Sequence, residues 1–173
     1  MSLMRNIARS YRAPGKVVSG LADDDLREPQ VLFFGLLACG LIYVAQWPGL
    51  SRAATLDPSI TFEQRMGGAL FGVMFLLPLV LYAIAAMLQL ALRLTGRAVP
   101  GLHVRLAFFW ALLAVTPLML AQGGMIAFLG AHPAVTAFGF VVAGAFLYML
   151  IAGLRAVMAN ARLDANEDRV RKD

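Results

Sequence analysis

The sequence has little charge, little histidine and little cysteine, and each shortage excludes a class of protein. Asp, Glu, Lys and Arg make up only 14% of its 173 residues, whereas a typical soluble domain carries roughly 25%. The two histidines and the single cysteine, Cys39, are too few for a cysteine-rich metal centre, and no intramolecular disulfide can form. We therefore expect an integral membrane protein that holds no metal and no cofactor.

Apolar residues are abundant instead, at 60% of the chain, and they gather in three intervals without any charge. These intervals lie between Glu28 and Arg52 (23 residues), between Arg65 and Arg93 (27 residues), and between Arg105 and Arg155 (49 residues). A helix needs about 20 apolar residues to cross a bilayer, so the third interval holds two helices joined by the turn "GAHPAV". The pattern predicts four spans, near 30–48, 67–94, 105–130 and 134–158.

The predicted fold is an all-α integral membrane protein, a bundle of four transmembrane helices. Only helices and closed barrels satisfy the backbone in lipid, and these runs lack the alternation of a barrel strand. Residues 1–28 form a cytoplasmic or interfacial segment before the bundle at 29–158, and 159–173 form a charged cytoplasmic tail. Pro78 and Pro117 fall inside spans, where proline removes a backbone donor, and we expect each to kink its helix.

Lys and Arg are distributed unevenly between the two sides of this bundle. The N-terminal tail, the loop after the second span and the C-terminal tail hold five, three and five of them, whereas the loop after the first span holds two. Thirteen against two places both termini in the cytoplasm, because cytoplasmic loops carry the excess of basic residues. Trp47 and Trp110 lie near opposite ends of spans, where aromatic rings prefer the membrane interface.

Two groups of basic residues flank the spans on the predicted cytoplasmic side. Spacings of four, three and four residues stack the first group on one helical face, opposite Leu3, Met4, Ile7 and Tyr11; its members are Arg5, Arg9, Arg12 and Lys16. Such an amphipathic helix lies among lipid headgroups, and each basic residue adds about 1 kcal/mol of attraction to an anionic leaflet. The alternative is an irregular basic tail.

The second basic group consists of Arg93, Arg97 and Arg105 in the loop "LRLTGRAVPGLHVR". It is interpreted as a positive-inside anchor at the headgroups, with a specific lipid-phosphate or partner site as the alternative. Because basic residues are spread over both tails and two loops, the net charge of +5 gives no continuous face for nucleic acid. We expect membrane lipids with anionic headgroups and other integral membrane proteins as partners.

Small residues recur at four-residue spacing within three of the spans. The pairs are Gly35 with Cys39, Gly68 with Gly72, and Gly139 with Ala143. Small residues let two helix backbones approach closely in lipid. We predict an internal contact for Gly68 and Gly72, since the second span can touch the first and the third. Gly139 and Ala143 are predicted to face a partner, since the last helix has only one sequential neighbour.

The spans hold little that could carry chemistry. No Asp, Glu, Lys or Arg lies deep inside a span, where proton relays and ion-coupled transporters place such groups. His103 and His132 have no Cys, carboxylate or second His nearby in the chain for acid–base work. We therefore expect a protein that is not an enzyme and acts as a scaffold, assembly factor or accessory subunit of a larger membrane complex. The alternative is a channel or transporter for a small neutral solute or lipid, with Pro78 and Pro117 as hinges.

Two stretches resemble the Yip (Rab/Ypt-interacting) membrane-protein superfamily in its bacterial branch. They are "APGKVVSGL" and "LYAIAAMLQLALRLTGRAVPGLHVRLAFFWALLAVTPLML". The residues that occupy the family's loop, helix-start and late-proline positions are Gly96, Gly101, Arg105, Trp110, Ala111 and Pro117. The resemblance implies a Yip-like fold in a bacterial inner membrane, with no settled activity. Family members typically have five spans, whereas this sequence turns polar after the fourth, so we expect no fifth helix.

The uneven distribution of basic residues generates a prediction of topology. A reporter fused after Asp173 should be cytoplasmic, and one inserted within residues 51–64 should lie on the opposite side of the membrane. Alkaline phosphatase and fluorescent-protein fusions read the two sides. A C-terminal fusion on the outer side would contradict the predicted orientation.

Overall fold

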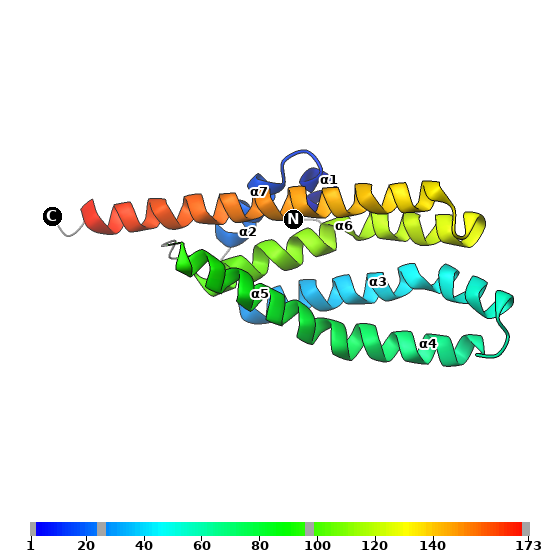
Figure 1. Cartoon of the computed structure of the whole chain (residues 1–173). Coiled ribbons are helices and arrows are strands. Elements are labelled where there is room, and N and C mark those ends of the chain that lie inside the picture. The colour runs from blue at the N-terminus through cyan, green and yellow to red at the C-terminus, as the bar shows by residue number, and fades with distance from the viewer. Residues whose placement is uncertain (1–2, 24–26, 96–98, 171–173) are drawn as a thin grey trace.

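The computed structural model describes residues 3–23, 27–95 and 99–170, with side chains to residue 163, and this part of the chain contains helices and no strand (Figure 1). The elements run in the order α1 (Leu3–Ser10), α2 (Pro14–Asp23), α3 (Glu28–Leu56), α4 (Phe62–Phe71), the π-helical turn η1 (Gly72–Leu76), α5 (Leu77–Leu94), α6 (Gly101–Leu129) and α7 (Pro133–Val170). Four segments are long and apolar enough to cross a membrane: Glu28–Leu56, Phe62–Leu94, Gly101–Leu129 and Pro133–Leu163. The all-α, four-span prediction is confirmed.

Four helix ends lie four or more residues beyond the predicted spans, among them the start of the third span, at Gly101 rather than 105. The first span does not stop at Pro48 but continues to Leu56, because neighbouring helices in a bundle can tolerate a proline within a transmembrane helix. The second span begins earlier, at Phe62, where Thr61 and Gln64 form a capping box. The fourth helix runs on to Val170, through most of the predicted tail, since no proline or glycine follows Gly153.

The two prolines predicted to kink their helices have different surroundings. Pro78 follows η1, in which the Leu77 N–H bonds to the Gly72 carbonyl in place of an α-helical bond. A π turn of this kind lets the helix continue into a proline, which has no backbone N–H to donate. Pro117 removes the donor that would reach the Leu113 carbonyl, and the Thr116 hydroxyl donates to that oxygen instead, at 2.8 Å. At both prolines the helix therefore continues.

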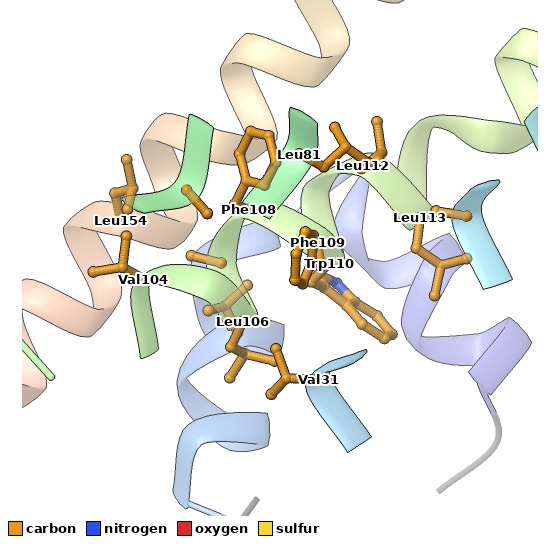
Figure 2. Close-up of a cluster of buried hydrophobic side chains, with 14 of the residues drawn as sticks. Val31, Leu81, Val104, Leu106, Phe108, Phe109, Trp110, Leu112, Leu113 and Leu154 are labelled. Atoms are coloured by element: carbon orange, nitrogen blue, oxygen red, sulfur yellow. The ribbon is translucent and has the colours of Figure 1, made fainter. Parts of the chain in front are cut away.

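α6 is the central element, and α1, α2, α3, α5 and α7 all contact it. Every residue from 106 to 116 is buried, so this half of the helix is covered around its whole circumference. Figure 2 shows consecutive α6 side chains pointing to different neighbours, with Leu106 beside Val31 of α3 and Val104 beside Leu154 of α7. The core of the protein therefore lies around one half of one helix.

α3 and α6 pack closely because small residues of each helix meet the other. A Cβ placed on Gly35 would lie 3.3 Å from the Phe109 ring, and Cys39, one turn further on, is fully buried. At the far end Gly123 of α6 lies directly against the backbone of Ala45. The Gly35–Cys39 pair thus faces inward, whereas the contact at Gly123 was not predicted from the sequence.

The contact at Gly123 generates a test that uses its own neighbour as control. Gly123→Ala would drive a methyl group into the Ala45 carbonyl oxygen, and we expect it to lower the free energy of unfolding by about 1–3 kcal/mol. Gly124→Ala has no described atom within 4 Å and should be neutral, or stabilising by up to about 1 kcal/mol, because alanine favours the helix. Unfolding of the purified protein in detergent measures both, and equal effects would contradict this packing.

Candidate functional site

The most unusual feature of the molecule is a short helical hairpin, formed by α1 and α2, that packs onto the bundle. Ser10, the last residue of α1, is fully buried, and its hydroxyl accepts a 2.9 Å hydrogen bond from the Trp110 indole. The same hydroxyl donates to the Asn6 carbonyl at 2.8 Å. In the turn that follows, the Tyr11 hydroxyl donates to the Ala114 carbonyl at 2.9 Å. One buried and one partly buried hydrogen bond to α6 therefore hold the hairpin against the middle of that helix.

The second helix of the hairpin packs against α7. A Cβ on Gly15 would lie 3.2 Å from the Ala152 carbonyl oxygen, and Val18 fills the space beside Gly153. Further along, the Asn160 amide donates to the Ser19 hydroxyl at 3.0 Å. Later residues of α2 contact later residues of α7, so the two helices run in the same direction.

The depth of the hairpin follows from the helices that it contacts. The 22 residues from Pro133 to Leu154, directly before Arg155, the first charged residue of α7, span about 33 Å in a helix. The hydrocarbon core of a bilayer is about 30 Å thick. If Pro133–Leu154 fills that layer, α2, which packs from Ala152 to Asn160, crosses the edge of the layer next to Arg155, and the Tyr11–Ala114 contact lies further from that edge.

The four N-terminal basic residues do not share one helical face as predicted. Arg5 and Arg9 lie on α1, Arg12 lies in the turn and Lys16 lies on α2, although all four are exposed. Because α1 ends at Ser10 and α2 begins at Pro14, the four-three-four spacing no longer places the four residues on one helical face. Ile7, predicted to face lipid, packs into the protein core instead.

A groove of about 390 Å³ separates the two helices of the hairpin. Both polar and apolar residues line it: Asn6, Arg9, Lys16, Val17, Gly20, Leu21 and Asp23. Arg9 stands on one wall and Lys16 on the other. Arg5 and Arg12 do not line it. Two residues of the predicted basic group thus line the groove, and the other two lie outside it.

Trp110 was predicted at the membrane interface, and this is wrong. Its side chain is 1% exposed and lies edge-on to Phe34, with ring centroids 5.2 Å apart. Burial of an indole N–H requires a partner, which Ser10 provides from 100 residues away in the chain.

The second basic group divides between solvent and an ion pair. Arg105 of α6 pairs with Glu28 of α3 at 2.8 Å, which joins the N-terminal ends of the two helices. Arg93 is exposed at the end of α5. Arg97 lies outside the described residues. The partner of Arg105 could not be deduced from the loop sequence, because Glu28 stands 77 residues earlier.

On the predicted outer side, arginines hold the helix ends. Arg52 donates to the Ala127 carbonyl at 3.1 Å, near the C-terminus of α6, where a positive charge is favoured by the helix dipole. Gly130, with φ of 62°, ends that helix. In the loop after α3, hydrogen bonds from Ser59, together with the nearby Arg65, lower the pKa of the Asp57 carboxyl. Arg65 and Asp57 form a 3.0 Å ion pair.

The prediction that Gly68 and Gly72 make an internal contact is wrong. No described atom lies within 4 Å of a Cβ built on either residue. Phe71 and Phe75 lie on the same stretch, exposed and stacked with centroids 5.6 Å apart. α3 and α6 pack so closely on one another that the second span covers only one flank of them, and only 17% of its apolar window is buried.

The pair predicted to face a partner is split by the structure. A Cβ on Gly139 would lie 2.9 Å from the Gln122 side chain of α6, so this glycine faces inward. Ala143 is exposed. The reason is that α6 lies along α7 and reaches Gly139 through the long Gln122 side chain.

The remaining candidates for chemistry are scattered over the described part of the chain. His103 lies near the start of α6, whereas the His132 ring accepts a 3.1 Å hydrogen bond from the Ala134 N–H at the start of α7. Within the described residues no group of three His, Cys, Asp or Glu could hold a metal ion. The apolar gap between α3, α5 and α6 has a volume of about 10 Å³, which is roughly the size of one water molecule.

Comparisons with protein-family models, with curated proteins and with solved structures find no match for this chain. The geometry of the hairpin and of the outward faces is therefore the basis for assigning a function. The chain is a multi-pass helical membrane protein.

Proposed function

We propose that this protein acts by binding within the membrane, without catalysis, as a scaffold, assembly factor or accessory subunit of a larger membrane complex. We place it in a bacterial inner membrane with both termini in the cytoplasm, on the basis of its basic flanks and its resemblance to the Yip superfamily. Anionic lipids and other integral membrane proteins are the proposed partners. The fold is proposed to be Yip-like on the strength of the residues quoted above.

The observation that carries this proposal is the outward face of Gly68 and Gly72. Small residues four apart on a transmembrane helix permit close approach of a second helix, and no helix of this chain takes that place among the described residues. Phe71 and Phe75 flank the small residues with two exposed, stacked rings. Two glycines next to a pair of exposed rings suit a helix from another protein.

The rest of the second span supports the same interpretation. Its inner side touches the bundle through the buried Val73, Leu81 and Ala85 and through partly buried neighbours. Large apolar side chains cover its outer side, among them Leu79 and Met87 at 69% and 70% exposure. Lipid alone can solvate such a surface, but lipid does not require glycine at a helix crossing. The glycines therefore support our proposal of a protein partner on this face.

Gly68→Ile tests this face of the second span. The branched side chain should leave cellular abundance and unfolding unchanged, because no described atom outside the local helix backbone lies within 4 Å of a Cβ at that position. It should reduce binding of a partner subunit about fivefold or more, since overpacking a close contact typically costs about 1–3 kcal/mol. Affinity purification in mild detergent with quantitative mass spectrometry measures both quantities.

The matched control is Gly144→Ile, which also meets no described atom within 4 Å but lies on the fourth span. It should retain every subunit that Gly68→Ile loses. The proposed face is wrong if the two variants retain the same subunits. If the abundance of Gly68→Ile alone fell, the result would support the internal contact predicted from the sequence instead.

A further inference from the structure

We propose that the groove between α1 and α2 is a binding site for the phosphodiester headgroup of an anionic phospholipid. This inference rests on the proposed cytoplasmic orientation of the hairpin, and it does not involve the Gly68–Gly72 face. It replaces diffuse attraction of a basic segment to the membrane with one defined site. Two of the four N-terminal cations belong to that site, and two do not.

The groove places two cations on facing walls. Arg9 comes from α1 and Lys16 from α2, and Asn6 lines the same space. Neither cation forms an ion pair within the described part of the chain. Arginine presents a planar set of donors that suits phosphate oxygens, and lysine adds a point charge. Two such groups around one space fit a tetrahedral anion.

The net charge of the groove lining indicates which class of lipid headgroup it can bind. Among the described residues that line the groove, Arg9 and Lys16 contribute two positive charges and Asp23 one negative charge, which leaves a net charge of one for this part of the lining. The Asp23 carboxylate also accepts a 3.3 Å hydrogen bond from Asn160 of α7. One uncompensated positive charge matches the single negative charge of a phosphodiester whose headgroup carries no amine.

The position of the groove suits a lipid rather than a soluble anion. α2 crosses the inner edge of the hydrocarbon layer beside α7, so the groove opens at the depth of phosphates and glycerol groups. Val17 and Leu21 give it an apolar side next to the cations. Its volume of about 390 Å³ is within the usual range of small-molecule sites, so it holds a headgroup and glycerol while the acyl chains lie outside.

The hairpin itself is held firmly enough to form a site. The Trp110–Ser10 and Tyr11–Ala114 hydrogen bonds fix α1 and the turn to α6. Contacts at Gly15 and Val18 fix α2 to α7. The two walls of the groove are thus each anchored to a different transmembrane helix. A preformed site binds more tightly because little has to be ordered on binding.

Native mass spectrometry of the full-length protein in detergent tests the site. The purified protein is titrated with dioleoyl phosphatidylglycerol and, separately, with dioleoyl phosphatidylcholine. We expect the first bound lipid to be phosphatidylglycerol with about tenfold preference. Arg9→Gln with Lys16→Gln should weaken phosphatidylglycerol binding about tenfold or more, because each basic residue near an anionic lipid contributes about fivefold in affinity.

Arg5→Gln with Arg12→Gln removes the same charge from the same hairpin but not from the groove, and it should change affinity less than twofold. Equal losses in the two double variants would overturn the defined site in favour of diffuse attraction. Equal affinity of wild type for the two lipids would overturn the selectivity for an anionic headgroup. Glycerophosphoglycerol, the headgroup without acyl chains, should not displace the lipid; displacement at similar concentration would identify a soluble phosphodiester as the ligand.

Discussion

The structure depends on the burial of one half of α6 around its whole circumference. A transmembrane helix at the centre of a bundle needs neighbours on every side, and three other spans can supply only part of that cover here. α3 lies on one side, α7 on another, and α5 touches the helix over a shorter length. The N-terminal hairpin covers the remaining side, where Trp110 carries a polar N–H that lipid cannot satisfy.

This requirement explains why a break in helical structure is tolerated at such depth. Between Ser10 and Pro14 the chain turns, and the freed backbone groups must bond within the protein. The Arg12 and Ala13 N–H groups both donate to the Arg9 carbonyl, at 3.0 and 2.9 Å. Irregular backbone is found at membrane depth where it is packed against protein, and here α6 and α7 provide that surface.

Charge and hydropathy were sufficient to predict the fold class and the number of spans. Long intervals without charge admit few other interpretations in lipid. The ends of the helices were harder, because Pro48 looked like a terminus and is instead inside α3. The same sequence pattern was also unable to show that α7 continues through a charged segment to Val170.

The candidate sites depended on contacts between residues far apart in the chain, and these could not be predicted. Trp110 near a span end has the character of an interface residue until Ser10 is known to lie beside it. Gly123 and Gly124 are adjacent and identical, so only the structure distinguishes the one that meets α3. Gly68 and Gly72 were correctly recognised as a small-residue pair, but a pattern on one helix does not say which helix it faces.

The central claim is that the N-terminal hairpin is part of the bundle rather than a separate helix among the headgroups. A Cβ on Gly15 would lie 3.5 Å from the Ala156 Cβ, a separation at which a disulfide can form. The most direct measurement is therefore disulfide formation in membranes between Gly15→Cys and Ala156→Cys, in a chain where Cys39, the only native cysteine, is replaced by Ala. The account predicts near-complete bridging under mild oxidation and none when Gly20→Cys replaces Gly15→Cys; equal bridging of the two pairs, or none in either, would contradict it.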